Sequence, residues 1–247
     1  TVGSLLNKRL IKSTNKANYI IANSNFTKNL AIKVGIDESK IKVIFPGINK
    51  PKSINIKYKK EADIIFGDSF PKIITVARLD KRKGHDKILM VIKNLKIKFP
   101  KIKYVSIGFG DEEKNLKKLA KELKIENEVI FLKHHDENIK LALIEKSNLF
   151  LMPSRIEKKS VEGFGISFME AASYSVGSIG GKDGGASDAI DHEQTGFICD
   201  GNSLDDIYQS ISNILENNKY KVFGRKAEEV SKKFYWSEII KKYLEIL

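Results

Sequence analysis

The sequence predicts an α/β fold, a Rossmann-like, doubly wound parallel sheet with helices on both faces. Short apolar runs without polar alternation recur along the chain, for example at 72–77 and 149–152. Such runs are typical of parallel strands that are buried on both faces. Helical segments separate the runs, and strands that alternate with helices build βα repeats, in which ligands bind outside the carboxyl ends of the strands. Motifs at strand ends are therefore the candidates for function.

The first 50 residues predict two helices and two strands. The expected elements are a helix at 4–16, a strand at 19–22, a helix at 25–34 and a strand at 42–45. Ser24 is a candidate N-cap for the second helix and Gly35 is its expected end. Pro46 and Gly47 form a turn signal after the second strand. A polar linker is expected at 51–70.

The rest of the chain predicts a second, longer series of strands and helices. Strands are expected at 72–77, 104–107, 129–132, 149–152, 178–179 and near 196–199. Helices are expected at 84–98, 112–123, 137–146, 166–175, 204–217 and from about 222 to the end. This regular alternation supports one complete doubly wound domain.

The charge of the chain is unevenly distributed. Its 247 residues carry 44 Lys and Arg against 31 Asp and Glu, a net charge of +13. The first 60 residues hold 13 basic and two acidic residues, and the remainder 31 and 29. A basic surface attracts nucleic acid, anionic lipid headgroups or phosphorylated substrates, and a solvated lysine-rich surface without a partner is the alternative. Nucleic acid is not expected, because the basic segment lacks stacking motifs and a recognition helix.

Cysteine content and hydropathy exclude several classes. The single cysteine, Cys199, excludes an internal disulfide framework and a Cys-rich zinc site, and we expect it to be a small buried side chain. One thiol fits a reducing compartment, and the chain starts without a hydrophobic leader, so a cytoplasmic location is expected. No apolar run approaches the ~18 residues of a membrane-spanning helix.

Two loops that directly follow predicted strands carry either cations or glycines. Arg78 and Lys83 follow strand 72–77, and two fixed cations there suit a phosphate, although a plain basic loop is the alternative. Gly108 and Gly110 follow the next strand, and a Gly-x-Gly lets a ligand approach the backbone. That glycine pair alone is a weak signal, since a turn explains it equally.

The strongest motif follows strand 149–152. Glu162 lies in a glycine-containing loop that enters a helix, and Glu170 lies about one turn into that helix. The N-terminus of a helix offers backbone N–H groups to an anion. Carboxylates accept hydrogen bonds from sugar hydroxyls, so two of them beside a phosphate site predict a sugar-phosphate ligand. Because the helix is otherwise apolar or small around Glu170, that carboxylate needs a partner.

Together these motifs resemble the retaining GT-B glycosyltransferases of the large bacterial glycan-assembly family, which includes phosphatidylinositol mannosyltransferases and lipopolysaccharide and capsule transferases. The matching pieces lie at 77–84, 107–111, 129–132, 152–154, 162–171, 184–185 and 195–197. The resemblance covers residues 17–247. It implies transfer of a sugar from a nucleotide-sugar donor to a glycan or lipid-linked acceptor with retention of configuration. GDP-mannose is the first donor expected and a UDP-sugar the second.

The resemblance also implies roles for individual residues. Arg78 and Lys83 would hold the donor pyrophosphate and stabilise the leaving group, and Glu162 would bind donor-sugar hydroxyls near the anomeric carbon. Glu170 would bind the ribose hydroxyls. Backbone groups of the glycine loops would lie against the donor, at Phe164, Gly165, Ile166, Gly108 and Gly110. No metal or other cofactor is implied, because the arginine and lysine do the work of a magnesium ion.

The nucleobase is expected beside the loop after strand 129–132. Asp136 or Glu137 would suit guanine, which offers two adjacent N–H donors to a carboxylate. The alternative is that both carboxylates cap the next helix. His134 and His135 are expected to be exposed polar residues rather than ligands.

The resemblance divides the chain into four parts. These are an incomplete C-terminal part of the acceptor domain at 1–50, a linker at 51–70, a nucleotide-sugar-binding domain at 71–230 and a C-terminal helix at 231–247. The basic first part also suggests peripheral attachment to the inner face of the cell membrane. Alternatives are a nucleotide-sugar-binding subunit without catalysis, a phosphorylase, whose cofactor lysine motif is not apparent, and a nucleic-acid-binding module.

Overall fold

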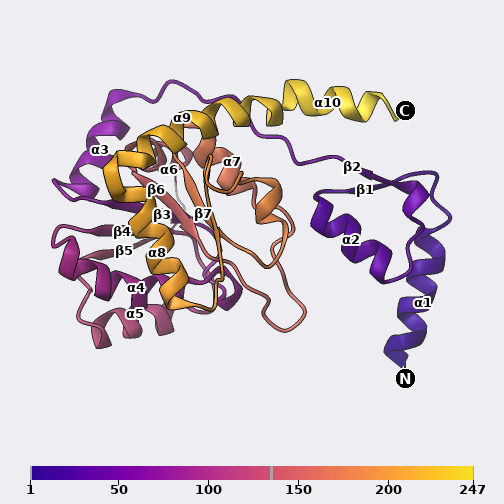
Figure 1. The fold of residues 1–247 in the computed structure, drawn as a ribbon, viewed down its shortest axis with the longest axis horizontal. Coiled ribbons are helices and arrows are strands. Elements are labelled where there is room, and N and C mark those ends of the chain that lie inside the picture. The colour runs from indigo at the N-terminus through magenta and orange to yellow at the C-terminus, as the bar shows by residue number, and fades with distance from the viewer. Residues whose placement is uncertain (1, 134–135, 247) are drawn as a thin grey trace.

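The computed structural model describes residues 2–133 and 136–246, and its main body is a six-stranded parallel sheet (Figure 1). The strands run in the order β5-β4-β3-β6-β7-β8 and every neighbouring pair is parallel. Their bounds are β3 (Lys72–Val76), β4 (Lys103–Ile107), β5 (Val129–Leu132), β6 (Leu149–Met152), β7 (Ser178–Gly181) and β8 (Gly196–Cys199). The α/β fold with a parallel sheet is thus confirmed. The strand order reverses between β3 and β6, where a doubly wound sheet opens a crevice for ligands.

Helices cover both faces of this sheet and divide the core in two. One face carries α4 (His85–Lys98), α5 (Glu113–Glu122) and α8 (Leu204–Leu215), and the other carries α3 (Ile56–Phe66), α6 (Glu137–Lys146), α7 (Ile166–Ser173) and part of α9 (Lys219–Ser231). Successive strand residues serve opposite cores, since Ile73 packs with the first set and Ile74 with the second. Burial on both faces explains why the strands are largely apolar.

A small lobe, residues 2–50, lies beside the main body (Figure 1). It contains α1 (Val2–Thr14), α2 (Asn25–Lys33) and a parallel pair of strands, β1 (Ile20–Ala22) and β2 (Ile41–Val43). Ser24 caps α2 as expected, because its hydroxyl accepts a hydrogen bond from the Thr27 N–H at 2.9 Å. We call this part the first lobe, and residues 56–231 the main body.

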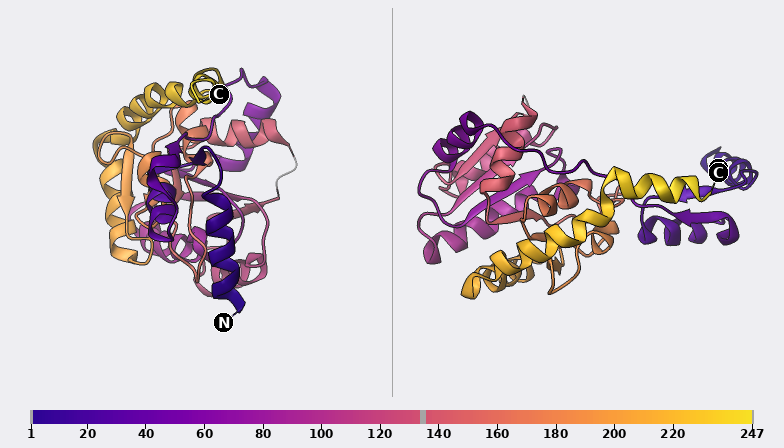
Figure 2. Two further views of the ribbon diagram at one scale, coloured as in Figure 1. Left: turned by 90° about the vertical axis from the view of Figure 1, so that its right-hand side faces the viewer. Right: turned by 90° about the horizontal axis from the view of Figure 1, so that it is seen from above.

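The C-terminal end of the chain returns to the first lobe. Figure 2 shows α10 (Trp236–Leu244) leading away from the main body towards that lobe. The Ile48 N–H donates to the Phe234 carbonyl at 2.8 Å, and the Trp236 N–H donates to the Ile48 carbonyl at 3.0 Å. The segment that leaves the first lobe is therefore bonded to the start of the last helix.

Two sequence expectations need correction. The polar linker at 51–70 contains an 11-residue helix, α3, which Asn55 caps by accepting from the Lys57 N–H at 3.0 Å. Only Ala62 and Phe66 of this helix are buried. The helix therefore has the polar composition of a linker, although it packs on the sheet. The last helical stretch is also two helices, because Tyr235 is extended between α9 and α10. None of the described helices has the length and apolar character to cross a membrane.

Candidate donor site at the carboxyl edge of the sheet

The loops that follow β3 and β6 meet through an ion cluster. Lys83, in a short 3-10 turn before α4, and Glu162, in the loop before α7, are both buried and form an ion pair. Arg82 reaches the same carboxylate oxygen, with Nη1 3.2 Å from Oε2 of Glu162. Burial is the largest influence on Lys83 and lowers its pKa, although Glu162 acts in the opposite direction. Two cations on one carboxylate leave local positive charge, which favours a further anion.

The backbone around Glu162 is fixed by the loop after β7. The Glu162 carbonyl accepts a hydrogen bond from the Gly185 N–H at 2.9 Å, and Glu162 pairs with Gly184 as a short parallel bridge. Gly184 has a φ of +120°, and a Cβ there would lie 2.4 Å from the Glu162 carbonyl oxygen. Only glycine fits this approach, so the Gly184-Gly185 pair holds the carboxylate loop in place.

The three residues expected to offer backbone groups to a donor lie directly after this bridge. Gly165 is the N-cap of α7, with a φ of +88°, and Ile166 is the first residue of the helix. The Phe164 side chain is buried and stacks on Phe45 of the first lobe, with ring centroids 5.5 Å apart. This segment therefore also joins the two parts of the molecule.

Arg78 lies in the same loop as Lys83 but in a different environment. Its side chain is 66% exposed and its Nη2 lies 3.5 Å from Oδ1 of Asp80. The Arg78 backbone is held by a hydrogen bond, since His85 Nε2 lies 3.1 Å from the Arg78 carbonyl oxygen. A carbonyl only accepts, so Nε2 carries the proton. Burial lowers the pKa of His85 to about 4, which keeps the ring neutral.

Gly108 and Gly110 pack against this loop rather than lining an open space. A Cβ at Gly108 would lie 2.0 Å from the Ala77 carbonyl oxygen, and a Cβ at Gly110 2.6 Å from that of Leu79. The Leu79 N–H also donates to the Phe109 carbonyl at 3.0 Å. The glycine pair thus lets the loops after β3 and β4 lie against each other.

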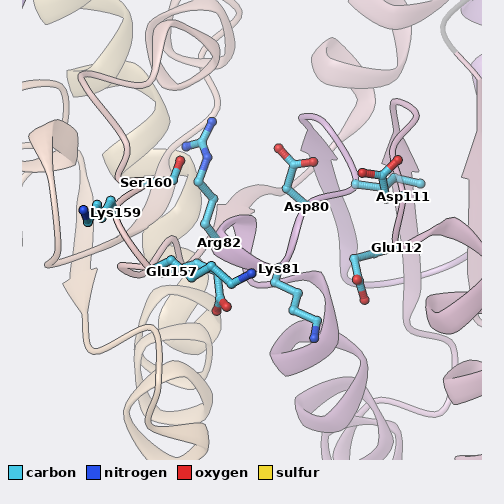
Figure 3. Close-up of a pocket in the computed structure, with 10 residues that line it drawn as sticks. Asp80, Lys81, Arg82, Asp111, Glu112, Glu157, Lys159 and Ser160 are labelled. Atoms are coloured by element: carbon cyan, nitrogen blue, oxygen red, sulfur yellow. The ribbon is translucent and has the colours of Figure 1, made fainter. Parts of the chain in front are cut away.

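A cavity of about 630 Å³ opens beside Arg82. Figure 3 shows Asp80, Asp111 and Glu112 on one side of it, and Glu157, Lys159 and Ser160 on the other. Arg82 lies between the two groups in this view (Figure 3), and it also reaches Glu162. The cavity therefore adjoins the ion cluster, and both signs of charge line it.

Glu170 has the partner that its apolar surroundings require. The Lys140 ammonium, on α6, lies 3.2 Å from Oε1 of Glu170 and 2.8 Å from Oε1 of Glu137. Burial acts most strongly on Lys140 and lowers its pKa, but the two carboxylates together outweigh it, so the pKa lies above its ordinary value. Lys140 is therefore a buried, charged link between α6 and α7.

Of the two carboxylates expected beside a nucleobase, Asp136 caps α6. Its Oδ1 accepts from the Asn138 N–H at 2.8 Å and from the Asn138 side chain at 3.0 Å. The capping alternative therefore holds for Asp136, while Glu137 pairs with Lys140. A cavity of about 210 Å³ adjoins both α6 and the ends of β4 and β5. His134 and His135 lie outside the described residues.

The structure adds three residues that the sequence did not single out: Arg82, Lys140 and His85 as a buried ring. Each is one charged or polar residue in a segment rich in them, and its contacts follow only from packing. Burial raises the pKa of the Cys199 thiol to about 12, as suits a core side chain. Within the described ranges, no group of three or more His, Cys, Asp or Glu side chains could hold a metal ion.

Comparison with known proteins identifies one family model and several relatives. The family model described as glycosyl transferases group 1 matches residues 56–230. A GDP-mannose-dependent alpha-(1-6)-phosphatidylinositol monomannoside mannosyltransferase of Mycobacterium tuberculosis is 27% identical over 181 residues, which cover 72% of this chain and 47% of the relative. An uncharacterized glycosyltransferase of Methanocaldococcus jannaschii is 26% identical over 100% of this chain and 60% of its own length. The chain thus spans about half of the mycobacterial relative.

Solved structures share the fold. The structure of HepE from Anabaena in complex with UDP and glucose has a TM-score of 0.84 at 21% identity, over 98% of this chain and 67% of that chain. A glycosyltransferase from Rickettsia africae has a TM-score of 0.81 at 24% identity, over 96% of this chain and 66% of that chain. At these identities the agreement concerns the fold alone, and it includes the first lobe.

Proposed function

The chain belongs to the group 1 glycosyl transferases, and from that premise we propose that it transfers a sugar, with retention of configuration, from a nucleotide-sugar to a glycan or lipid-linked acceptor. The observation that carries the proposal is the ion cluster of the buried Lys83 and Glu162 with the half-buried Arg82, at the strand-order reversal of the sheet. It combines cations for a pyrophosphate with a carboxylate for sugar hydroxyls. The alternative, a subunit that binds the donor without turnover, has no specific structural support.

In this proposal the cations act on the leaving group. As the bond between the anomeric carbon and the phosphate oxygen breaks, negative charge grows on the phosphate, and Lys83, Arg82 and Arg78 stabilise it. The acceptor hydroxyl forms the new bond to that carbon on the same face, and its proton passes to the departing phosphate. Glu162 accepts hydrogen bonds from the sugar and supports the developing positive charge. Glu170 accepts from the ribose hydroxyls.

GDP-mannose is the first donor to test and a UDP-sugar the second. The mycobacterial relative is named as GDP-mannose-dependent, which supports a guanine nucleotide. The HepE structure holds UDP and glucose, which supports the alternative. Asp136 caps α6 through Oδ1 and also lines the 210 Å³ cavity, so we propose that this carboxylate lies beside guanine in addition to its capping role.

Thermal unfolding of the chain with a panel of nucleotides tests the proposal. We expect GDP-mannose and GDP to raise the melting temperature more than UDP-glucose and UDP, with about 2.7 kcal/mol of added stability at 100 times the Kd. Lys83→Ala should lose the response, and Lys101→Ala, which breaks an exposed pair with Asp68, should keep it. No stabilisation by any nucleotide in the panel would defeat the proposed function. Equal or larger shifts with UDP would assign the donor to the uridine class.

The acceptor and location are proposals of the same kind. We propose cytoplasmic action at the inner face of the cell membrane, because the first lobe carries exposed basic residues and phosphate-bearing lipid acceptors are anionic. Radiolabelled sugar transfer from GDP-mannose into a lipid extract, compared with transfer to a soluble glycan, tests the acceptor class. Incorporation into the soluble glycan alone would contradict the lipid-linked acceptor.

A further inference from the structure

Lys140 is a buried cation that the proposed reaction leaves unexplained. It is 6% exposed, although it lies in the first half of a helix whose polar residues are mostly solvated. A lysine is rarely buried to this degree unless it is paired. Its two carboxylate partners come from different helices, Glu137 from its own helix α6 and Glu170 from α7. The lysine therefore fixes α6 against α7 at the position of Glu170.

Lys140 lies at the wall of a cavity and does not serve the core alone. It lines the 210 Å³ cavity, together with apolar side chains at the carboxyl ends of β4 and β5, Ile107 and Leu132. Its two carboxylate partners, Glu170 and Glu137, line a second, smaller cavity of about 80 Å³. A largely apolar cavity and a carboxylate, both in contact with Lys140, match the two halves of a nucleoside, a flat base and a hydroxylated ribose.

A free glutamate at position 170 would have to be ordered when the ligand binds. Its side chain is 32% exposed, and immobilising such a side chain at a binding site costs conformational entropy. The Lys140 ammonium removes this cost in advance by holding Oε1 of Glu170. The second oxygen, Oε2, is then presented for a hydroxyl donor.

We propose that Lys140 is a positioning residue, which holds Glu170 in the orientation that accepts hydrogen bonds from the ribose hydroxyls of the donor nucleotide. The inference rests on the proposed function and deepens it. It assigns to the Lys140–Glu170 pair a preference for ribose over deoxyribose.

Calorimetric titration of the chain with GDP and UDP, each paired with its 2′,3′-dideoxy counterpart, tests this role. The wild-type chain should bind the ribose form about ten- to a hundredfold more tightly than the dideoxy form, the range of one hydrogen bond to a charged group. Lys140→Met should bring the ribose form close to the dideoxy form and leave the dideoxy affinity unchanged. Lys140→Arg, which keeps the charge and donors, should restore part of the preference.

Three controls separate positioning from a structural role. Lys146→Met, on the same helix, breaks only a partly exposed pair with Asp63 and should leave both affinities unchanged. Glu170→Gln should lose the ribose preference alone, and adding Lys140→Met to it should cost nothing further, because both act on one interaction. Lys140→Gln, whose shorter side chain is neutral and polar, repeats the test should the methionine variant not fold.

The outcomes that overturn the inference are distinct from those that overturn the proposed function. If Lys140→Met weakens the ribose and dideoxy forms equally, the lysine acts on the phosphates or on the fold. If it changes neither, or if the wild-type chain shows no ribose preference, Glu170 is not positioned for the ribose. If the wild-type chain binds no nucleoside diphosphate at all, the proposed function itself fails.

Discussion

The main body and the first lobe use positive charge in opposite ways. In the main body two cations of the proposed donor site share one carboxylate, since the buried Lys83 and the half-buried Arg82 both pair with Glu162. In the first lobe Lys8, Arg9 and Lys12 are exposed on one helix. Buried pairs are screened little by salt, whereas exposed charges farther apart than a Debye length of about 10 Å at 0.1 M salt are largely screened. The comparison leads to two separate expectations. The main body should bind the proposed nucleotide-sugar through fixed geometry, and the first lobe should bind the proposed anionic membrane surface through its density of positive charge.

The two parts are nevertheless joined near the candidate site. Phe45 of the first lobe lies between Phe164 and Phe234, with ring centroids 5.5 Å and 5.6 Å away. Asp188 of the main body accepts from the Asn25 backbone N–H at 2.8 Å, at the start of α2. The loop that carries Glu162 is therefore packed against the first lobe, and substitutions can separate what belongs to each part.

The largest expected effect concerns acid stability, and it belongs to the main body alone. His85 has a pKa of about 4 in the folded chain, caused mainly by burial, against 6.5 as its ordinary value. The unfolded state binds the proton more readily, so the stability from a neutral His85 is complete above about pH 6.5 and is lost as the pH falls through 4. The expected loss is about 3 kcal/mol. Urea unfolding at several pH values between 7 and 4 measures it.

Matched variants separate the effect of the His85 ring on stability from the effect of carboxylates that titrate in the same pH range. His85→Gln should flatten the loss of stability between pH 6.5 and 4, although it lowers stability at pH 7. His192→Gln removes a histidine whose side chain is 53% exposed and should leave the slope unchanged. If wild type and His85→Gln lose the same stability over this range, the buried ring is not the cause.

The next effect concerns phosphate binding by the buried cluster. Lys83→Ala should weaken binding of a nucleoside diphosphate by about 1.5–3 kcal/mol, the range for hydrogen bonds to charged groups. The loss should change little between 50 and 300 mM salt, because Lys83 is buried. Arg78→Ala should also weaken binding, with a stronger salt dependence, since that side chain is 66% exposed. Calorimetric titration at both salt concentrations compares them. Unchanged affinity in both variants would refute the clamp.

Much of this arrangement could be predicted from the sequence, because strand ends and glycines are local signals. The apolar runs gave every strand of the main sheet, and the loops with Lys83 and Glu162 were recognised at strand ends. The polar helix α3 was missed, since two buried residues among charged ones do not produce a clear apolar face. Its existence depends on the sheet that it covers.

The partners of the site residues could not be predicted, because they are set by packing across long stretches of sequence. Lys140 and Glu170 are 30 residues apart on different helices, and nothing in the helix of Lys140 marks that lysine among its neighbours. Arg82 precedes Lys83 in a run of cations, and only the fold shows that it reaches Glu162. Asp136 could cap a helix or face a base, and the sequence alone supported both readings.

A smaller effect concerns the junction between the two parts. Asp188→Ala removes the carboxylate that accepts from the backbone and side chain of Asn25, at 2.8 Å and 2.7 Å. Asn25 is exposed and Asp188 is half-buried, so the expected loss is about 1 kcal/mol. Hydrogen exchange should speed up in α2 and not in the main sheet. Asp68→Ala, which breaks an exposed pair with Lys101, is the control. Uniform acceleration throughout the chain would mean that Asp188 supports the main body instead.

The smallest effect per residue is expected for the exposed cations of the first lobe, and it decides whether charge density matters there. Lys8, Arg9, Lys12 and Lys16 are exposed on and just after α1. Each should contribute roughly 1 kcal/mol to binding of an anionic membrane surface at low salt, and almost nothing at high salt. Replacing one of them with Gln should reduce co-sedimentation with phosphatidylserine vesicles slightly, and reversing all four charges should abolish most of it. Neutral vesicles and the Lys101→Ala variant, altered on the main body, serve as controls. If anionic vesicles capture no more of the wild-type chain than neutral ones at low salt, the basic surface has no lipid role, and the contrast between the two parts reduces to a difference in composition.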